Sequence, residues 1–99
     1  MTDPATAPPH AGPVATEMHR RLTAALAPTR LDLVDESDNH RGHAGHDERG
    51  ESHFALIIES HSFAGQSRVT RQRAIYTALG ELMDERVHAL SIKAFAPGE

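Results

Sequence analysis

The chain has 99 residues, no cysteine and a formal net charge of −4 at pH 7. This length fits one domain, and the missing thiols exclude disulfides, thiol catalysis and a metal site built from this chain's own thiolates. The acidic balance argues against a general nucleic-acid coat, although a local basic face is compatible with it, and no apolar run approaches the roughly 18 residues of a membrane span.

Residues 1–14 form a proline- and alanine-rich lead without hydrophobic periodicity, and we expect this lead to be disordered. The segment lacks the basic and apolar regions that make a signal peptide. It also carries Asp3 and no arginine, which is unlike a transit peptide. The sequence therefore predicts a cytoplasmic protein.

A first helix is expected next, with Thr16 as its cap and Pro28 at its end. Its apolar side chains recur at the spacing of one helical stripe. They are Met18, Leu22, Ala25 and Leu26. Residues 31–35 then alternate as a short strand does, which places Leu31 and Leu33 on its buried face.

Residues 36–51 contain no apolar side chain larger than alanine, and three of the chain's eight histidines lie among them. A loop this long is uncommon inside a compact domain and is usually functional or disordered. His40, His43 and His46 follow one another at every third position, but the glycines between them disfavour a helix. Histidines on so polar a loop have no core to pack into, so they are candidate metal ligands, and one alternative is a zinc or copper site made by the loop alone.

The clearest strand is residues 52–59, which has apolar side chains on both faces. The larger ones share one face: Phe54, Leu56 and Ile58. Ala55 and Ile57 lie on the other face, and we expect both faces to be largely covered. A turn follows at residues 61–65.

A second helix is expected to begin at Ser67 or Thr70. Its apolar stripe consists of Ile75, Tyr76, Leu79, Leu82 and Met83. Three arginines lie at its start, where positive charge opposes the helix dipole. They are Arg68, Arg71 and Arg73. Two interpretations stay open for them: solvated side chains that cover the sheet, or contacts to nucleic-acid phosphates.

The last strand is expected at residues 87–95, with Leu90, Ile92 and Ala94 on one face. His88 is in phase with these residues but lies at the very beginning of the strand. We expect its ring to pack at the rim of the sheet with one nitrogen exposed, either as a structural histidine or as a metal ligand. The order of elements predicts an α+β domain, αββαβ, in which both helices cover one face of a three-stranded sheet.

Several short motifs of the chain resemble those of the BolA family. They are residues 31–37, Gly42-His43, Ser52-His53-Phe54, residues 63–65, residues 71–76 and residues 87–90. The resemblance spans residues 15–97, which we interpret as a BolA-like domain. One departure is Gln72, where the family commonly has histidine, and that position is not one of the family's metal ligands.

The resemblance implies a fold similar to a type II KH domain and a partnership with a monothiol, CGFS-type glutaredoxin. In such heterodimers a [2Fe–2S] cluster bridges the two proteins. The family supplies the histidine that begins the last strand and a histidine or cysteine from the loop between the first two strands. In this chain these are His88 and His40, with His43 and His46 as alternative loop ligands, while the partner's cysteine and glutathione supply the remaining ligands.

A chain that has histidines but no cysteine can complete such a cluster and cannot hold one alone, and mixed histidine and cysteine ligation has a precedent in Rieske centres. The implied role is iron–sulfur cluster trafficking or iron and redox regulation. Some family members are described as DNA-binding transcriptional regulators, which makes the second helix and its arginines the alternative functional element. The sequence shows no nucleophile motif, so no enzyme activity is expected. The free protein is expected to be a monomer or a weak homodimer.

Overall fold

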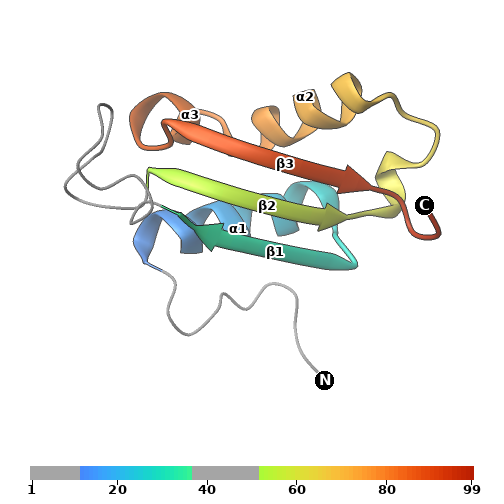
Figure 1. Cartoon of the computed structure of the whole chain (residues 1–99), viewed down its shortest axis with the longest axis horizontal. Helices are drawn as coiled ribbons and strands as arrows, with labels where there is room; N and C mark the ends of the chain where they lie inside the picture. Colours follow the sequence, from blue (N-terminus) through green and yellow to red (C-terminus); the bar gives the residue numbers. More distant parts are fainter. Residues whose placement is uncertain (1–11, 37–51) are drawn as a thin grey trace.

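The computed structural model describes residues 12–36 and 52–99. In this part of the chain the elements follow one another as helix, strand, strand, helix, short helix and strand (Figure 1). They are α1 (Pro13–Leu26), β1 (Arg30–Asp35), β2 (His53–Glu59), the 3₁₀ turn η2 (His61–Phe63), α2 (Arg68–Leu79), α3 (Leu82–Glu85) and β3 (Ala89–Phe95). The predicted α+β architecture is therefore confirmed.

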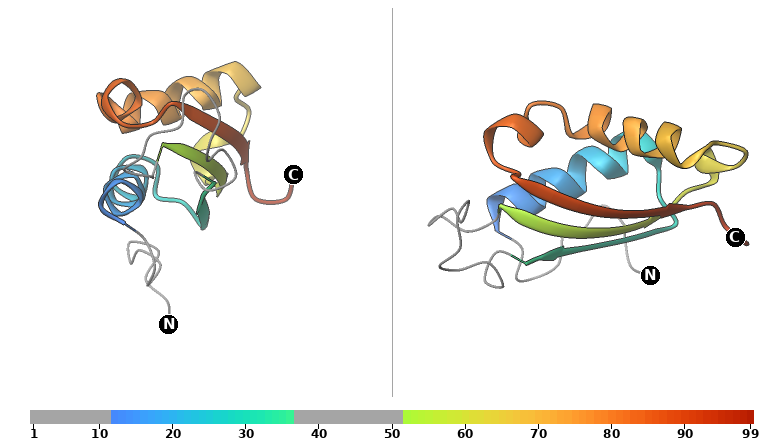
Figure 2. Two further views of the ribbon diagram at one scale, coloured as in Figure 1. Left: turned by 60° about the vertical axis from the view of Figure 1, so that its left-hand side comes forward. Right: turned by 45° about the horizontal axis from the view of Figure 1, so that its top comes forward.

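The three strands form one mixed sheet in the order β1-β2-β3, with β2 in the middle. β1 runs antiparallel to β2, and β3 runs parallel to it. The register aligns His53 of β2 with Ala89 of β3, so the beginnings of these two strands lie at the same rim of the sheet. The helices α1 and α2 pack on one face of the sheet, as expected, and the other face carries no helix of the described chain (Figure 2).

The core lies between this helical layer and the covered face of the sheet. It contains Met18 and Leu22 of the predicted α1 stripe and the predicted inner residues of β2, and Leu26 is partly buried against it. Ala25, which was also expected in the stripe, is exposed. The apolar side chains that are at most 2% exposed are Met18, Leu22, Phe54, Leu56, Ile58, Phe63, Ile75 and Leu79. Val14 and Ala15 are also buried, which explains why α1 begins at Pro13 and not at the expected Thr16. Proline suits the first turn of a helix, because its missing N–H has no intrahelical partner there.

The second predicted helix is in fact two helices. Ser67 caps α2 as expected, since its Oγ accepts a hydrogen bond of 3.1 Å from the Thr70 N–H. The helix then ends at Gly80, whose φ of 58° and ψ of −133° lie in a region that suits only glycine. Leu82 begins α3 and is buried, whereas Tyr76, which was expected in the apolar stripe, is 42% exposed.

The second face of β2 is also more open than expected. Ala55 and Ile57 are half-buried, and they alternate along β2 with the buried Phe54, Leu56 and Ile58, so they lie on the opposite face. None of the helices in residues 12–36 and 52–99 is both long and apolar enough to span a membrane.

Candidate metal-binding rim of the sheet

Ser52 organises the rim at which β2 and β3 begin. It is fully buried, and its backbone carbonyl accepts hydrogen bonds from the N–H groups of His88 at 2.7 Å and Ala89 at 3.2 Å. On the other side of β2, the Glu36 N–H donates to the His53 carbonyl at 2.7 Å. The last described residue before segment 37–51 and the first one after it therefore lie at the same rim as His88.

His88 lies one residue before β3 and is exposed. This corrects the expectation that it belongs to the strand and packs on the core side. Val87, not His88, turns into the core, where it is 3% exposed. The backbone bond to Ser52 holds His88 at the rim, and its side chain is exposed there.

A second histidine lies beside it. The ring centroids of His53 and His88 are 6.2 Å apart, and the ring planes are tilted by 42°. The His53 Nδ1 is 2.9 Å from the Ser52 Oγ, a hydrogen bond in which either atom can be the donor depending on the tautomer. When His53 Nδ1–H donates to the hydroxyl, its Nε2 keeps the lone pair that a metal ion needs.

The spacing of the two rings constrains what they can bind. A zinc–nitrogen bond is about 2.0–2.1 Å long, so two imidazoles on one ion have ring centroids at most roughly 6 Å apart. The observed 6.2 Å is at this limit. The pair therefore suits one ligand with a neighbouring histidine beside it better than a chelate of a single ion. Within the described residues, no group of three or more His, Cys, Asp or Glu side chains is arranged to hold a metal ion.

The remaining predicted ligands, His40, His43 and His46, lie outside the described residues. His53 was not among the predicted ligands, because the alternation of residues 52–59 marks it only as the beginning of a strand. The signal that could have found it is the parallel pairing of β2 with β3, which brings the starts of both strands together.

The three arginines at the start of α2 do not act as one cluster. Arg71 donates to both carboxylate oxygens of Glu99, at 2.6 and 2.7 Å, and to the Ala94 carbonyl at 3.1 Å. Only 12% of its side chain is exposed. Arg68 and Arg73 are exposed, so two of the three predicted arginines are accessible to a phosphate group.

The Arg71 guanidinium lowers the pKa of the Glu99 carboxyl to about 2, helped by the hydrogen bond that this carboxylate accepts from the Ala96 N–H. Glu17 of α1 has the same pKa of about 2, because Arg20 and Arg21 both donate to it. Both carboxylates are therefore ionised and paired at neutral pH.

Residues 22–99 match the family described as BolA-like protein. A Sinorhizobium protein, described only as an uncharacterized protein in the cobS 5′ region, is 45% identical over 83 residues, which are 83% of this chain and 89% of that protein. The Escherichia coli DNA-binding transcriptional regulator BolA is 35% identical over 82 residues, 83% of this chain and 74% of that protein.

The fold gives the same result. The solved BolA domain of SufE1 from Arabidopsis thaliana superimposes with a TM-score of 0.78 at 40% sequence identity, covering 88% of this chain and 95% of that domain. The mixed three-stranded sheet with its helices on one face is thus the fold of a BolA domain. The chain belongs to the BolA-like protein family.

Proposed function

We propose that this protein is the cysteine-free partner of a monothiol glutaredoxin and that it co-ligates a bridging [2Fe–2S] cluster through histidines. The proposed ligands are His88 and one histidine of segment 37–51, with His40 first and His43 or His46 as alternatives. Its role would be to pass on or sense iron–sulfur clusters, as a binding protein and not an enzyme. Cytoplasmic localisation stays a prediction from the sequence.

One observation carries this proposal. His88 is exposed and anchored by its own backbone at the rim where both described ends of segment 37–51 lie. The segment that carries His40, His43 and His46 therefore begins and ends beside His88. Neutral imidazoles also fit the chemistry, since a chain without thiolates can contribute only part of the ligand set of a [2Fe–2S] cluster.

When it is bound, the cluster supplies one-electron chemistry and iron and sulfide for transfer. The contribution of this chain is to hold its imidazoles in place. Because imidazole must be neutral to ligate, the affinity of the site is expected to fall as the solution becomes more acidic.

Co-expression with a monothiol glutaredoxin from the same organism tests the proposal. We expect a coloured 1:1 complex whose visible absorption and circular dichroism are those of a [2Fe–2S] centre. The protein expressed alone should be colourless. A stable cluster on the isolated protein, or no association with any monothiol glutaredoxin of the organism, would contradict the proposal.

A second candidate function is DNA binding. It is favoured by the description of the Escherichia coli relative as a DNA-binding transcriptional regulator and by the exposure of Arg68 and Arg73 at the start of α2. Each phosphate contact should add about 0.9 to the slope of log affinity against log salt. We expect weak, non-specific binding whose slope flattens in the Arg68→Gln/Arg71→Gln/Arg73→Gln variant. A sequence-selective footprint that resists salt would rank DNA binding above the cluster role.

A further inference from the structure

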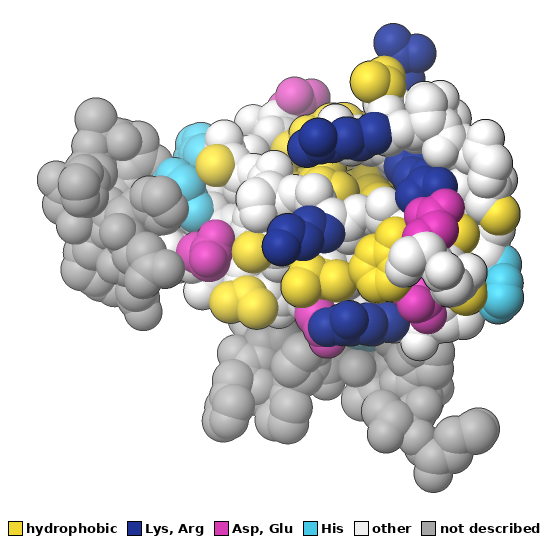
Figure 3. All heavy atoms as spheres, turned by 45° about the vertical axis from the view of Figure 1, so that its right-hand side comes forward, with side chains coloured by type: hydrophobic (Ala, Val, Ile, Leu, Met, Phe, Trp, Pro, Cys, Tyr) yellow, Lys and Arg dark blue, Asp and Glu magenta, His cyan; other side chains and the backbone are white. Residues whose placement is uncertain are grey.

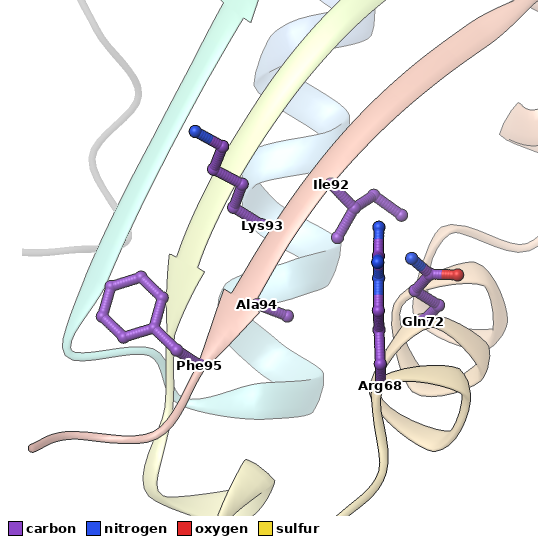
Figure 4. A pocket seen from close by; sticks show the side chains of 6 residues that line it. All are labelled: Arg68, Gln72, Ile92, Lys93, Ala94 and Phe95. Carbon is purple, nitrogen blue, oxygen red and sulfur yellow. The ribbon is translucent and has the colours of Figure 1, made fainter. Parts of the chain in front are cut away.

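A groove runs between α2 and β3, at the end of β3 that is remote from His88. It has a volume of about 300 Å³ and is lined by Arg68, Gln72, Ile92, Lys93, Ala94 and Phe95. Arg68 extends from α2 alongside Ile92, whereas Lys93 and Phe95 point to the other side of the strand (Figure 4). The four consecutive strand residues show that the groove follows the backbone of β3 itself.

The strand beside this groove is an edge strand of the described sheet. Ala89 N–H and Phe95 C=O bond toward β2, and the backbone groups of successive strand residues point to alternate sides. The N–H and C=O groups of Ile92 and the N–H of Ala94 therefore point outward along the groove. An edge of this kind is a template for one more strand.

The charges beside the edge of β3 indicate which sequence an added strand would need. Arg68 and Lys93 are both exposed at the groove, although the chain as a whole has a net charge of −4. One face of the molecule shows lysine and arginine side chains among hydrophobic and some acidic ones (Figure 3). Such a pattern fits a segment that alternates carboxylates with apolar side chains.

The same edge already binds one acidic side chain. Beyond β3, the Glu99 carboxylate accepts a hydrogen bond of 3.0 Å from the outward Ala96 N–H and two from Arg71, which itself caps the outward Ala94 carbonyl. One carboxylate thus combines an edge N–H with an α2 arginine. Arg68 lies one helical turn before Arg71 and offers the equivalent charge over Ile92.

From this geometry we propose that the α2–β3 groove binds an extended acidic segment of a partner protein as an additional strand on β3. Outward backbone groups of β3 give the main-chain bonds, Ile92 and Ala94 contact the apolar side chains on one face, and Lys93 pairs with the carboxylates on the other. Arg68 adds positive charge beside Ile92. A peptide fits better than a nucleic acid because the exposed backbone edge offers strand pairing, and because Arg71 is already committed to Glu99. The groove is separate from the histidine rim, since its nearest lining residue on β3, Ile92, follows His88 by four residues, or about 13 Å at 3.3 Å per residue.

The test uses a fluorescein-labelled synthetic peptide of alternating glutamate and valine. The comparison probes are the same peptide with lysine in place of glutamate, a version with alternate backbone amides N-methylated, and a single-stranded oligonucleotide. Anisotropy should show binding of the acidic peptide, at least tenfold weaker binding after N-methylation, and none of the lysine peptide. At saturation, amide hydrogen exchange of Ile92 should slow at least tenfold.

The Arg68→Gln/Lys93→Gln variant should lose at least tenfold in affinity. Arg30→Gln is the matched control, because Arg30 is an exposed arginine on β1, the opposite edge strand, and it should bind as the wild type does. The exchange measurement on the wild-type protein stands even if a variant fails to fold. Three outcomes would overturn the proposal. The lysine peptide could bind as tightly as the acidic one, or the oligonucleotide could bind best without protecting Ile92 from hydrogen exchange. The acidic peptide could also protect β1 instead of β3. None of these outcomes depends on whether a cluster is bound.

Discussion

Ser52 is the residue through which both rim histidines are held. Its carbonyl accepts the His88 N–H, and its hydroxyl lies within hydrogen-bond distance of the His53 Nδ1. A substitution of Ser52 by alanine keeps the carbonyl acceptor but removes the hydroxyl. A mutation of the Ser52 side chain should therefore affect His53 more than His88.

The first prediction separates the proposed ligands in the glutaredoxin complex. His88→Ala should abolish the holo spectrum or leave all-thiolate features while the apo fold is unchanged, because His88 is exposed and its backbone bond remains. His40→Ala should only shift or weaken the spectrum, since His43 and His46 can replace it, and the His40→Ala/His43→Ala variant should do more. Visible circular dichroism measures the outcome. An unchanged spectrum in His88→Ala would make it a structural rim histidine.

A second prediction assigns His53 a supporting position beside His88. His53→Ala should leave the type of spectrum intact but speed cluster loss about tenfold, the lower range for residues that support a metal ligand. Ser52→Ala should have a smaller effect in the same direction, since it removes only the hydroxyl partner of His53. His61→Ala is the control, because this exposed histidine lies at the other end of β2. A spectrum lost as completely as in His88→Ala would instead make His53 a direct ligand.

At the scale of the elements, the junction between α2 and α3 depends on Gly80 and Arg21. Arg21 of α1 donates to the Leu79 carbonyl at 2.8 Å and to Glu81 at 2.9 Å, which joins α1 to the place where the chain leaves α2. A Cβ added at Gly80 would lie 3.3 Å from the Arg21 Nη1. The backbone conformation requires glycine there, and an added Cβ would also force the Arg21 side chain to shift by a few tenths of an ångström.

Gly80→Ala should therefore destabilise the protein by about 1–3 kcal/mol, the cost of forcing a side chain into a glycine-only backbone conformation. Urea unfolding followed by circular dichroism measures this free energy. Thr77→Ala, at an exposed position of α2, is the control and should change the stability by about 0.5 kcal/mol or less. If the two variants were equally stable, the helix break would not depend on Gly80.

At the scale of the whole molecule, paired carboxylates set the response to acid. The pKa values of Glu17 and Glu99 are lowered from 4.5 to about 2 by their arginine partners. Groups with a lowered folded-state pKa stabilise the fold fully above their unfolded value, and this contribution disappears as the pH falls through the folded one. Both carboxylates are near solvent, so salt should weaken the effect.

We expect the wild-type Tm to fall between about pH 4.5 and pH 2. The Glu17→Gln/Glu99→Gln variant should have a lower Tm than the wild type at pH 7, and the two values should converge near pH 2. Thermal unfolding at a series of pH values, repeated in high salt, checks this. If the Tm difference between the wild type and the variant stayed unchanged at pH 2, these carboxylates would stabilise the fold by packing and not by charge.

The sequence alone determined the order of the main elements, the absence of thiolate ligands and much of the core, although it missed Val14 and Val87 and wrongly included Tyr76. Hydrophobic periodicity and composition are local properties. The apolar stripe of α1 and the alternation of β2 can be recognised without knowing which elements pack against them. His88 could be singled out in the same way, by its place in a motif and next to a strand.

Tertiary structure decided the rest, because it depends on which distant residues meet. Parallel pairing of β2 with β3 puts His53 beside His88, and the carbonyl of Ser52 turns His88 out of the strand that its alternation had predicted. The hydrogen bond from Arg71 to Glu99 separates Arg71 from the other two predicted arginines, which are exposed. The groove is accessible because β3 is an edge strand of the described sheet. No local pattern encodes such contacts, since each joins segments that are brought together only when the sheet forms.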